Sequence, residues 1–139
     1  MITLQGFPIP PSDNEIKLPI YRRGGGMTFV DTNTYKKFRM DLQIWIIENS
    51  RHLTTCRNEL RPLIDNHIPM KFEALCHFHH ARVWTQKKHI KKFDVQNRTK
   101  ALCDAVAKAL QIDDSQFFEV MMKKVAIDSG PESVTIKIW

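Results

Sequence analysis

Acidic side chains flank a helical pattern in the C-terminal half of the chain, and their oxygen atoms are of the kind that bind hard divalent cations. Asp94 precedes the pattern, Lys100 lies within its first two turns, and Asp113 and Asp114 follow it. Carboxylates suit Mg²⁺, which keeps several of its waters and needs only a few protein ligands. A metal there would activate water and neutralise charge on a phosphodiester, while a lysine would stabilise the transition state. If the acids meet, these residues favour phosphodiester hydrolysis.

The spacing of the acids does not by itself bring them together. Asp94 and the Asp113–Asp114 pair lie at opposite ends of a helix that would be about 20 Å long at a rise of ~1.5 Å per residue. Either the chain folds back along the helix after Leu110, or a neighbouring strand carries one acid to the other. The alternative is a structural role, because Asp94 favours a helix N-terminus and Asp-Asp-Ser is a common loop sequence.

The net charge of +6 is concentrated in one segment, residues 82–100, which hold seven basic side chains and a single acid, Asp94. The rest of the chain has as many acids as bases. Such focusing favours a polyanion, most simply nucleic acid, as the partner. The expected phosphate contacts in this segment are Lys87, Lys88, Lys91, Lys92 and Arg98. The alternative for this segment is a charge run that only faces solvent. Arg22 and Arg23, beside a run of three glycines, could form a mobile second contact with phosphates. The alternative for them is a flexible loop tip without a binding role.

Composition excludes several classes of protein. At 42% hydrophobic and 26% charged residues the chain is too apolar for disorder, and its apolar runs are too short for a membrane span. The N-terminus lacks the pattern of a secretory signal, which favours a cytoplasmic location. Three cysteines without CxxC spacing predict buried, reduced thiols.

Histidines and aromatic residues near the basic segment have two interpretations each. His77, His79 and His80 invite a zinc site, but no cysteine or acid stands at ligand spacing, so polar surface near a DNA path is favoured. Trp84 and Phe93 flank the basic run and could stack on unpaired bases, although aromatic side chains are more often core residues.

The hydrophobic periodicity predicts one α+β domain over residues 1–139, with a mainly antiparallel or mixed sheet packed against two principal helices. Helices are expected at 35–46, with Asp31 or Thr32 as N-cap, and at 97–110. A weaker helical stretch at 54–60 precedes Pro62. Strands are expected at 1–4, 70–83, 117–127 and 133–139, the last two forming a hairpin around the turn at 128–131. Residues 12–33 are expected to form a flexible loop and 84–93 a basic loop.

Residues 93–117 resemble the signature of the RusA-like Holliday junction resolvases. That family typically shows Asp-x-Asp-Asn, then a lysine, an aspartate, and Asp-Asp-x-Gln. The residues that fall on this pattern are Asp94, Asn97, Lys100, Asp104, Asp113, Asp114 and Gln116. The N-terminal Pro10-Pro11-Ser12 with Asn14 also matches, as do the first helix, the central strand, the basic run and the final hairpin. One position departs: Gln96 stands where the family has its second acid, and glutamine supplies neither negative charge nor a base.

The resemblance implies a structure-selective endodeoxyribonuclease that resolves four-way DNA junctions in recombination and repair by metal-dependent hydrolysis. Asp94, Lys100 and Asp114 would be catalytic, with Asp94 and Asp114 holding Mg²⁺ or Mn²⁺ and Asp113 and Gln96 as further ligands. Asp104 would either join the metal shell or orient Lys100 one turn away. Apart from the resemblance, the position of Phe93 immediately before Asp94 makes it the candidate wedge at the junction.

Paired cuts on a two-fold symmetric junction imply a homodimer. A bacterial or phage-encoded protein associated with the nucleoid is expected. Two alternatives stay open: a homologue impaired by Gln96 that binds branched DNA without cutting, and a generic module for RNA or single strands.

Overall fold

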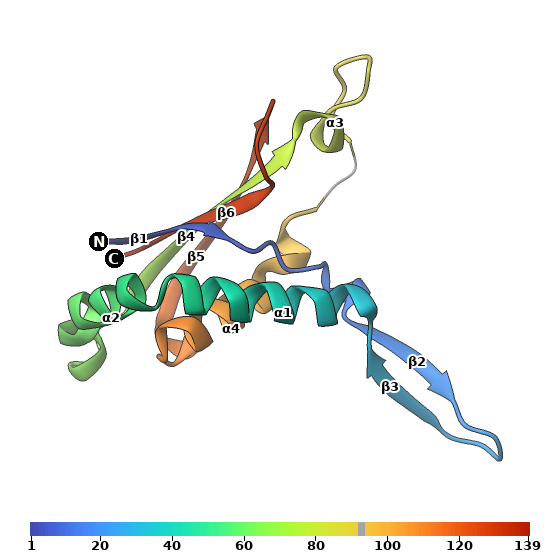
Figure 1. The fold of residues 1–139 in the computed structure, drawn as a ribbon, viewed down its shortest axis with the longest axis horizontal. Helices are drawn as coiled ribbons and strands as arrows, with labels where there is room; N and C mark the ends of the chain where they lie inside the picture. The colour runs from blue at the N-terminus through green and yellow to red at the C-terminus, as the bar shows by residue number, and fades with distance from the viewer. Residues whose placement is uncertain (92–93) are drawn as a thin grey trace.

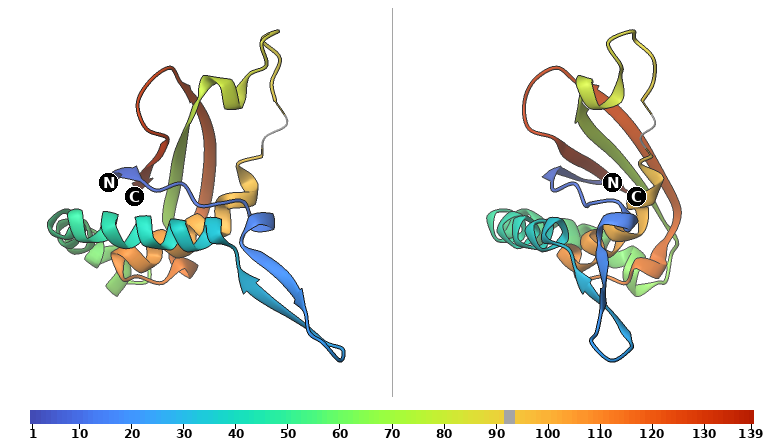
Figure 2. Two further views of the ribbon diagram at one scale, coloured as in Figure 1. Left: turned by 45° about the vertical axis from the view of Figure 1, so that its right-hand side comes forward. Right: turned by 90° about the vertical axis from the view of Figure 1, so that its right-hand side faces the viewer.

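A four-stranded mixed sheet with helices along one face forms the body of the protein (Figures 1 and 2). The computed structural model describes residues 1–91 and 94–139. The strand order is β1 (Ile2–Phe7), β6 (Ser133–Ile138), β4 (Met70–His79) and β5 (Phe117–Ile127). Strand β6 runs antiparallel to both β1 and β4, whereas β4 and β5 are parallel. This confirms an α+β fold with a mixed sheet.

The helical layer consists of α1 (Asn33–Glu48), α2 (Ser50–Asp65) and α4 (Thr99–Leu110), and a short α3 (His80–Val83) follows β4. The helix predicted at 35–46 is α1, whose N-cap Thr32 accepts a hydrogen bond from the Tyr35 N–H at 3.1 Å. The helix predicted at 97–110 is α4, preceded by the 3₁₀ turn η2 (Gln96–Arg98).

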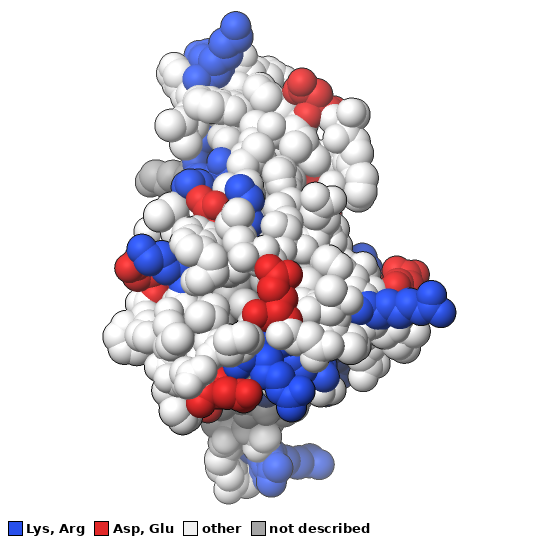
Figure 3. Space-filling view, turned by 90° about the vertical axis from the view of Figure 1, so that its left-hand side faces the viewer, with Lys and Arg blue, Asp and Glu red and all other residues white. Residues whose placement is uncertain are grey.

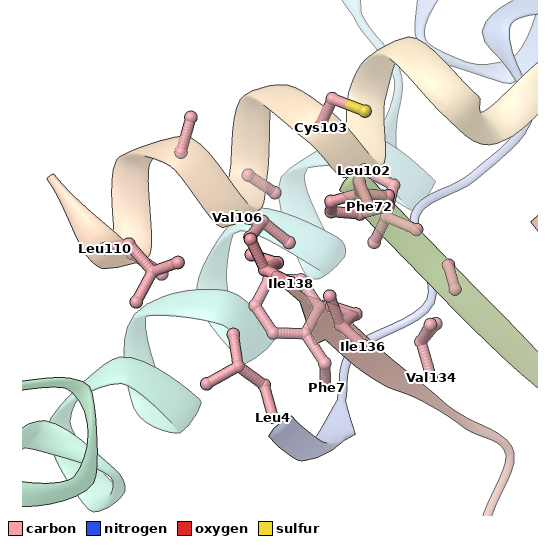
Figure 4. Packing of buried hydrophobic residues seen from close by; sticks show 14 of the residues in the cluster. Leu4, Phe7, Phe72, Leu102, Cys103, Val106, Leu110, Val134, Ile136 and Ile138 are labelled. Atoms are coloured by element: carbon pink, nitrogen blue, oxygen red, sulfur yellow. The ribbon is translucent and has the colours of Figure 1, made fainter. Parts of the chain in front are cut away.

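The core lies between the helical layer and one face of the sheet (Figure 4). Alternate residues of β4, among them Phe72 and Phe78, point into it, and so does the apolar stripe of α4 that includes Leu102 and Val106. The three cysteines, Cys56, Cys76 and Cys103, are buried and unpaired. Burial of this apolar surface stabilises the site on α4 by fixing the helix against the sheet.

The strands at 117–127 and 133–139 do not form the predicted hairpin. Strand β4 lies between them, because the connection through α4 returns the chain parallel to β4 and places β5 on one of its edges. The following turn then crosses the end of β4, where Glu132 Oε2 accepts the His79 N–H at 2.9 Å. Residues 80–83 are also helical and do not extend the strand as predicted.

The N-terminal half differs from expectation in two places. Helix α2 is longer than the predicted stretch at 54–60 and contains Pro62, because the buried face of Leu53, Cys56 and Leu60 holds it against the core. Residues 12–33 are not a loop: they contain the 3₁₀ turn η1 (Asp13–Glu15) and an antiparallel hairpin of β2 (Lys17–Tyr21) and β3 (Met27–Asp31). The pair Lys17↔Asp31 lies at the base of the hairpin, and the three glycines form the turn at its tip.

None of the helices in the described ranges is long and apolar enough to cross a bilayer.

Candidate carboxylate site and nucleic-acid surface

The chain folds back along α4 after the helix ends. Gln111 adopts the left-handed conformation (φ 55°, ψ 47°) that terminates many helices, and the Ile112 N–H donates to the Ala107 carbonyl at 3.0 Å. This reversal carries Asp114 to the side of Asp104 in the middle of α4. The sequence left open whether the chain folds back after Leu110 or a neighbouring strand carries one acid to the other. The structure shows the fold-back, which brings Asp114 to the helix.

Asp104 has a carboxyl group whose pKa lies above its ordinary value. Partial burial raises the pKa of Asp104, and a hydrogen bond and repulsion from the Asp114 carboxyl raise it further, together with repulsion from Asp13. Lys100, one helical turn away, opposes these effects. Burial and the same two carboxyl groups, Asp104 and Asp114, raise the pKa of the Cys103 thiol to about 11. Several acids thus converge on one spot beside Lys100.

A cavity of about 260 Å³ opens beside this cluster. Lys100, Asp104 and Lys108 line it from α4, and Tyr35 and Arg39 line it from α1. Asp13 and Ile16 complete it from the segment that precedes β2. The rest of the lining is mainly apolar and includes Phe38 and Leu42, so the polar chemistry is confined to the carboxylates and the cationic side chains. Carboxylates next to a lysine fit a hard divalent cation and a phosphodiester.

The other two candidate acids have local hydrogen bonds of the kind that the structural interpretation predicts. Asp94 Oδ1 accepts the Gln96 N–H at 2.8 Å, and Asp113 Oδ1 accepts the Ser115 N–H at 2.9 Å. The hydrogen bonds from Ser115 lower the pKa of Asp113. Asp94 lies two residues before η2, on the N-terminal side of α4, while Asp114 reaches the helix at Asp104. Within the described ranges no three His, Cys, Asp or Glu side chains form a metal-binding group.

Gln96 is exposed, in the first position of η2 and two residues from Asp94. Its amide oxygen is free of charge, so it adds a neutral ligand where an acid would add attraction for a cation. The structure leaves its side chain open to solvent beside the start of α4.

Arg98 does not lie on the surface, which argues against the predicted phosphate contact. Its side chain is only 7% exposed, and its Nη1 donates to the Pro10 carbonyl at 2.6 Å. The guanidinium also lies 5.9 Å from the centre of the Phe78 ring. Arg98 therefore holds the N-terminal segment against the core, where Pro10 and Pro11 are buried.

The basic loop is closed by its own hydrogen bonds. Trp84 pairs with Ile90, and the Lys91 ammonium donates to the Ala81 carbonyl at 2.6 Å, which ties Lys91 to the base of the loop. Lys87 and Lys88 are exposed near its tip. The predicted contact Lys92 and the predicted wedge Phe93 lie outside the described residues.

Two basic projections stand at opposite ends of the molecule (Figures 1 and 3). One is the loop with Lys87 and Lys88, and the other is the tip of the β2–β3 hairpin with Arg22 and Arg23, all exposed. On the face between them that Figure 3 shows, basic and acidic side chains alternate. The exposed lysines of the basic loop therefore lie far from the arginines at the tip of the hairpin.

One acid near the site was missed from the sequence. Asp13 lies near Asp104 because η1 packs against η2, and the only sequence signal for it was the N-terminal Pro-Pro-Ser motif. The His80 and Trp84 rings lie 6.3 Å apart, beside a recess that Lys91 also lines, which places the histidine run next to the basic loop. His77 and His79 instead contact Thr135 and the Gly130 carbonyl.

The family model described as Endodeoxyribonuclease RusA matches residues 8–139, nearly the whole chain. No curated protein matches the sequence.

Proposed function

Because the chain belongs to the RusA endodeoxyribonuclease family, whose members resolve Holliday junctions, we propose that it cuts four-way DNA junctions by metal-dependent hydrolysis of the phosphodiester backbone. The observation that carries this proposal is the pairing of Asp104 with Asp114 next to Lys100. Adjacent carboxyl groups repel each other, and a divalent cation between them would relieve that repulsion.

The residues around the cavity fit Mg²⁺, with Mn²⁺ as an alternative. Asp114 and Asp104 would hold the metal, with Asp94, Asp113 and Gln96 as further candidates for its shell. When bound, the metal would supply an activated water and neutralise the phosphate. Lys100 would bind the non-bridging oxygens and stabilise the charge that develops on them.

DNA binding is supported by the exposed lysines of the basic loop, Lys87 and Lys88, together with Arg22 and Arg23. These side chains would contact phosphates, so affinity would fall as salt rises. We also propose that the protein acts as a homodimer, since a four-way junction has approximate two-fold symmetry and needs two matched cuts.

A second function is favoured by one observation, the exposed Gln96 in place of an acid. A protein with one carboxylate fewer would bind the metal more weakly and would hold branched DNA without cutting it.

A cleavage assay on a mobile four-way junction and on a linear duplex of the same sequence, with Mg²⁺, Mn²⁺ or EDTA, tests the proposal. The enzyme interpretation expects metal-dependent cuts in the junction and an intact duplex. Junction binding with cleavage only after the substitution Gln96→Asp would establish the second function instead. Equal affinity for junction and duplex would contradict both.

A further inference from the structure

The β2–β3 hairpin projects away from the sheet and the helices (Figures 1 and 2). Its base is fixed to the body: the Thr32 N–H donates to the Ile16 carbonyl at 3.0 Å, and Asp31 pairs with Lys17 and Arg39. A two-stranded hairpin on its own is marginally stable in water. Packing within this chain therefore does not account for the hairpin.

Both faces of the hairpin expose apolar side chains. Leu18 and Ile20 lie on one face. Phe29 lies on the other with Tyr21 and Met27. Tyr21 is 78% exposed and Phe29 is 56% exposed. Exposed apolar side chains gathered on a projecting element in this way mark a binding site.

The charge and the shape of the tip limit what binds there. Residues 18–30 contain two arginines, Arg22 and Arg23, and no acid. The turn is closed by a hydrogen bond from the Arg22 N–H to the Gly26 carbonyl at 2.9 Å. All three glycines of the turn have positive φ, and a side chain at any of them would meet open space. The glycines thus serve the tight turn, which leaves a thin, cationic tip.

The base of the hairpin adjoins the carboxylate cluster. Asp13 and Ile16, which lead into β2, line the same cavity as Lys100 and Asp104. Arg39 lines that cavity too and pairs with Asp31 at the end of β3. DNA whose backbone lies at the cavity is therefore next to the base of the hairpin.

We propose that the hairpin is a DNA-binding arm that places Tyr21 and Phe29 against unstacked bases at the branch point while Arg22 and Arg23 hold the adjoining phosphates. This rests on the proposed action on junctions. DNA has two properties that complement the hairpin. Its anionic backbone complements the arginines, and the flat apolar surfaces of bases exposed at a branch point complement the aromatic side chains. A two-stranded ribbon fits a DNA groove, and inserted apolar side chains unstack base steps.

The test measures binding in EDTA, so that it is independent of cleavage, to a four-way junction that carries 2-aminopurine at the branch point. Anisotropy gives the affinity, and 2-aminopurine fluorescence reports base unstacking. The double variant Tyr21→Thr, Phe29→Thr keeps strand-forming residues. It should bind at least about tenfold more weakly, because it loses both stacking rings, and should lose most of the fluorescence increase. Tyr21→Phe, which keeps the ring, should behave like wild type.

The matched pair Met27→Thr and Met40→Thr controls for loss of an exposed methionine, because Met27 lies on the same face as Tyr21 and Phe29, whereas Met40 is 63% exposed on α1 and lies outside the hairpin. Only Met27→Thr should weaken binding. Unchanged affinity and fluorescence in the double variant would overturn the proposal. A second result would also overturn the proposal: light scattering shows that the double variant is monomeric, and its DNA affinity returns to the wild-type value at high protein concentration. In that case the hairpin binds a second copy of the chain and not DNA. If the wild type binds the junction no better than the duplex, the proposed function fails. The arm is then tested by affinity for the duplex. Weaker duplex binding by the double variant would support the arm, and unchanged duplex binding would overturn it.

Discussion

At the level of single residues, Asp104 and Asp114 show how a site can depend on a few atoms of backbone. The left-handed Gln111 and the bond from Ile112 to Ala107 reverse the chain, and the reversal makes two acids neighbours that are ten positions apart. The sequence alone identified Asp94, Lys100 and Asp114 by resemblance, and it treated Asp104 as either a metal ligand or a partner of Lys100. It could not indicate the pairing with Asp114, because one dihedral angle decides it.

Metal binding by the pair should be visible in stability. Mg²⁺ at about 100 times its Kd should stabilise the wild type by about 2.7 kcal/mol, because the cation binds only the folded state. Asp114→Asn should lose most of this increase in Tm. Asp65→Asn, in an exposed pair with Arg61 on α2, is the matched control and should keep it. An equal Mg²⁺-dependent rise in Tm for wild type and Asp114→Asn would rule out the pair as the metal site.

Gln96 is a position at which one substitution should strengthen Mg²⁺ binding. Gln96→Asp adds a carboxylate two residues from Asp94, and the added charge should lower the Mg²⁺ concentration needed for half-maximal junction cleavage by about tenfold, as ~1.4 kcal/mol of extra attraction would. The control Gln86→Asp adds the same charge at an exposed position of the basic loop. If both variants require as much Mg²⁺ as wild type, position 96 does not face the metal.

At the level of elements, α1 and α4 were predictable because their apolar stripes follow the helical period and face the core. The partners of β5 and β6 were not, because the local turn signal at 128–131 says nothing about β4 lying between the two strands. The hairpin at Lys17–Asp31 was missed for a related reason: proline and glycine are typical of loops, and here they lie in a strand exposed to solvent and in its turn.

The hairpin's arginines should contribute to the salt dependence of DNA binding. Each phosphate contact contributes about 0.9 to the slope of log affinity against log salt, so Arg22→Ala, Arg23→Ala should reduce that slope by about 2. Arg51→Ala, Arg61→Ala removes as much charge from exposed positions of α2 and should leave the slope nearly unchanged. An identical slope in wild type and the hairpin variant would remove the arginines from the DNA interface.

At the level of the whole molecule, the sheet is held together by charges on the face away from the helices as well as by the core. Glu73 on β4 pairs with Lys123 on β5 and lies 3.8 Å from the Lys137 ammonium on β6. The hydrogen bond from Lys123 is the main cause that lowers the pKa of Glu73. One carboxylate thus joins the central strand to both of its neighbours, including the two strands that the sequence wrongly paired with each other.

The stability contributed by Glu73 should depend on pH. Because its pKa is lower when folded, the carboxylate stabilises the fold above its ordinary value of 4.5, and this contribution is lost as pH falls through the lower, folded value. Glu73→Gln should lower Tm by a few degrees at pH 7, and the difference from wild type should shrink in acid below 4.5. Glu119→Gln, in an exposed pair with Lys71, should change Tm little. A deficit in Tm for Glu73→Gln that persists unchanged in acid would contradict this role.

The division of basic charge between the loop at Lys87–Lys88 and the tip at Arg22–Arg23 matches a substrate that extends over the whole molecule, as a branched DNA does. The central claim is that such a substrate is cut at the Asp104–Asp114 pair. Its most direct test is the single-turnover rate of junction cleavage in Mg²⁺ at saturating protein, for wild type and Asp114→Asn. We predict that both bind the junction equally and that the variant cuts at least about 100-fold more slowly. Cleavage by Asp114→Asn at the wild-type rate would contradict the account.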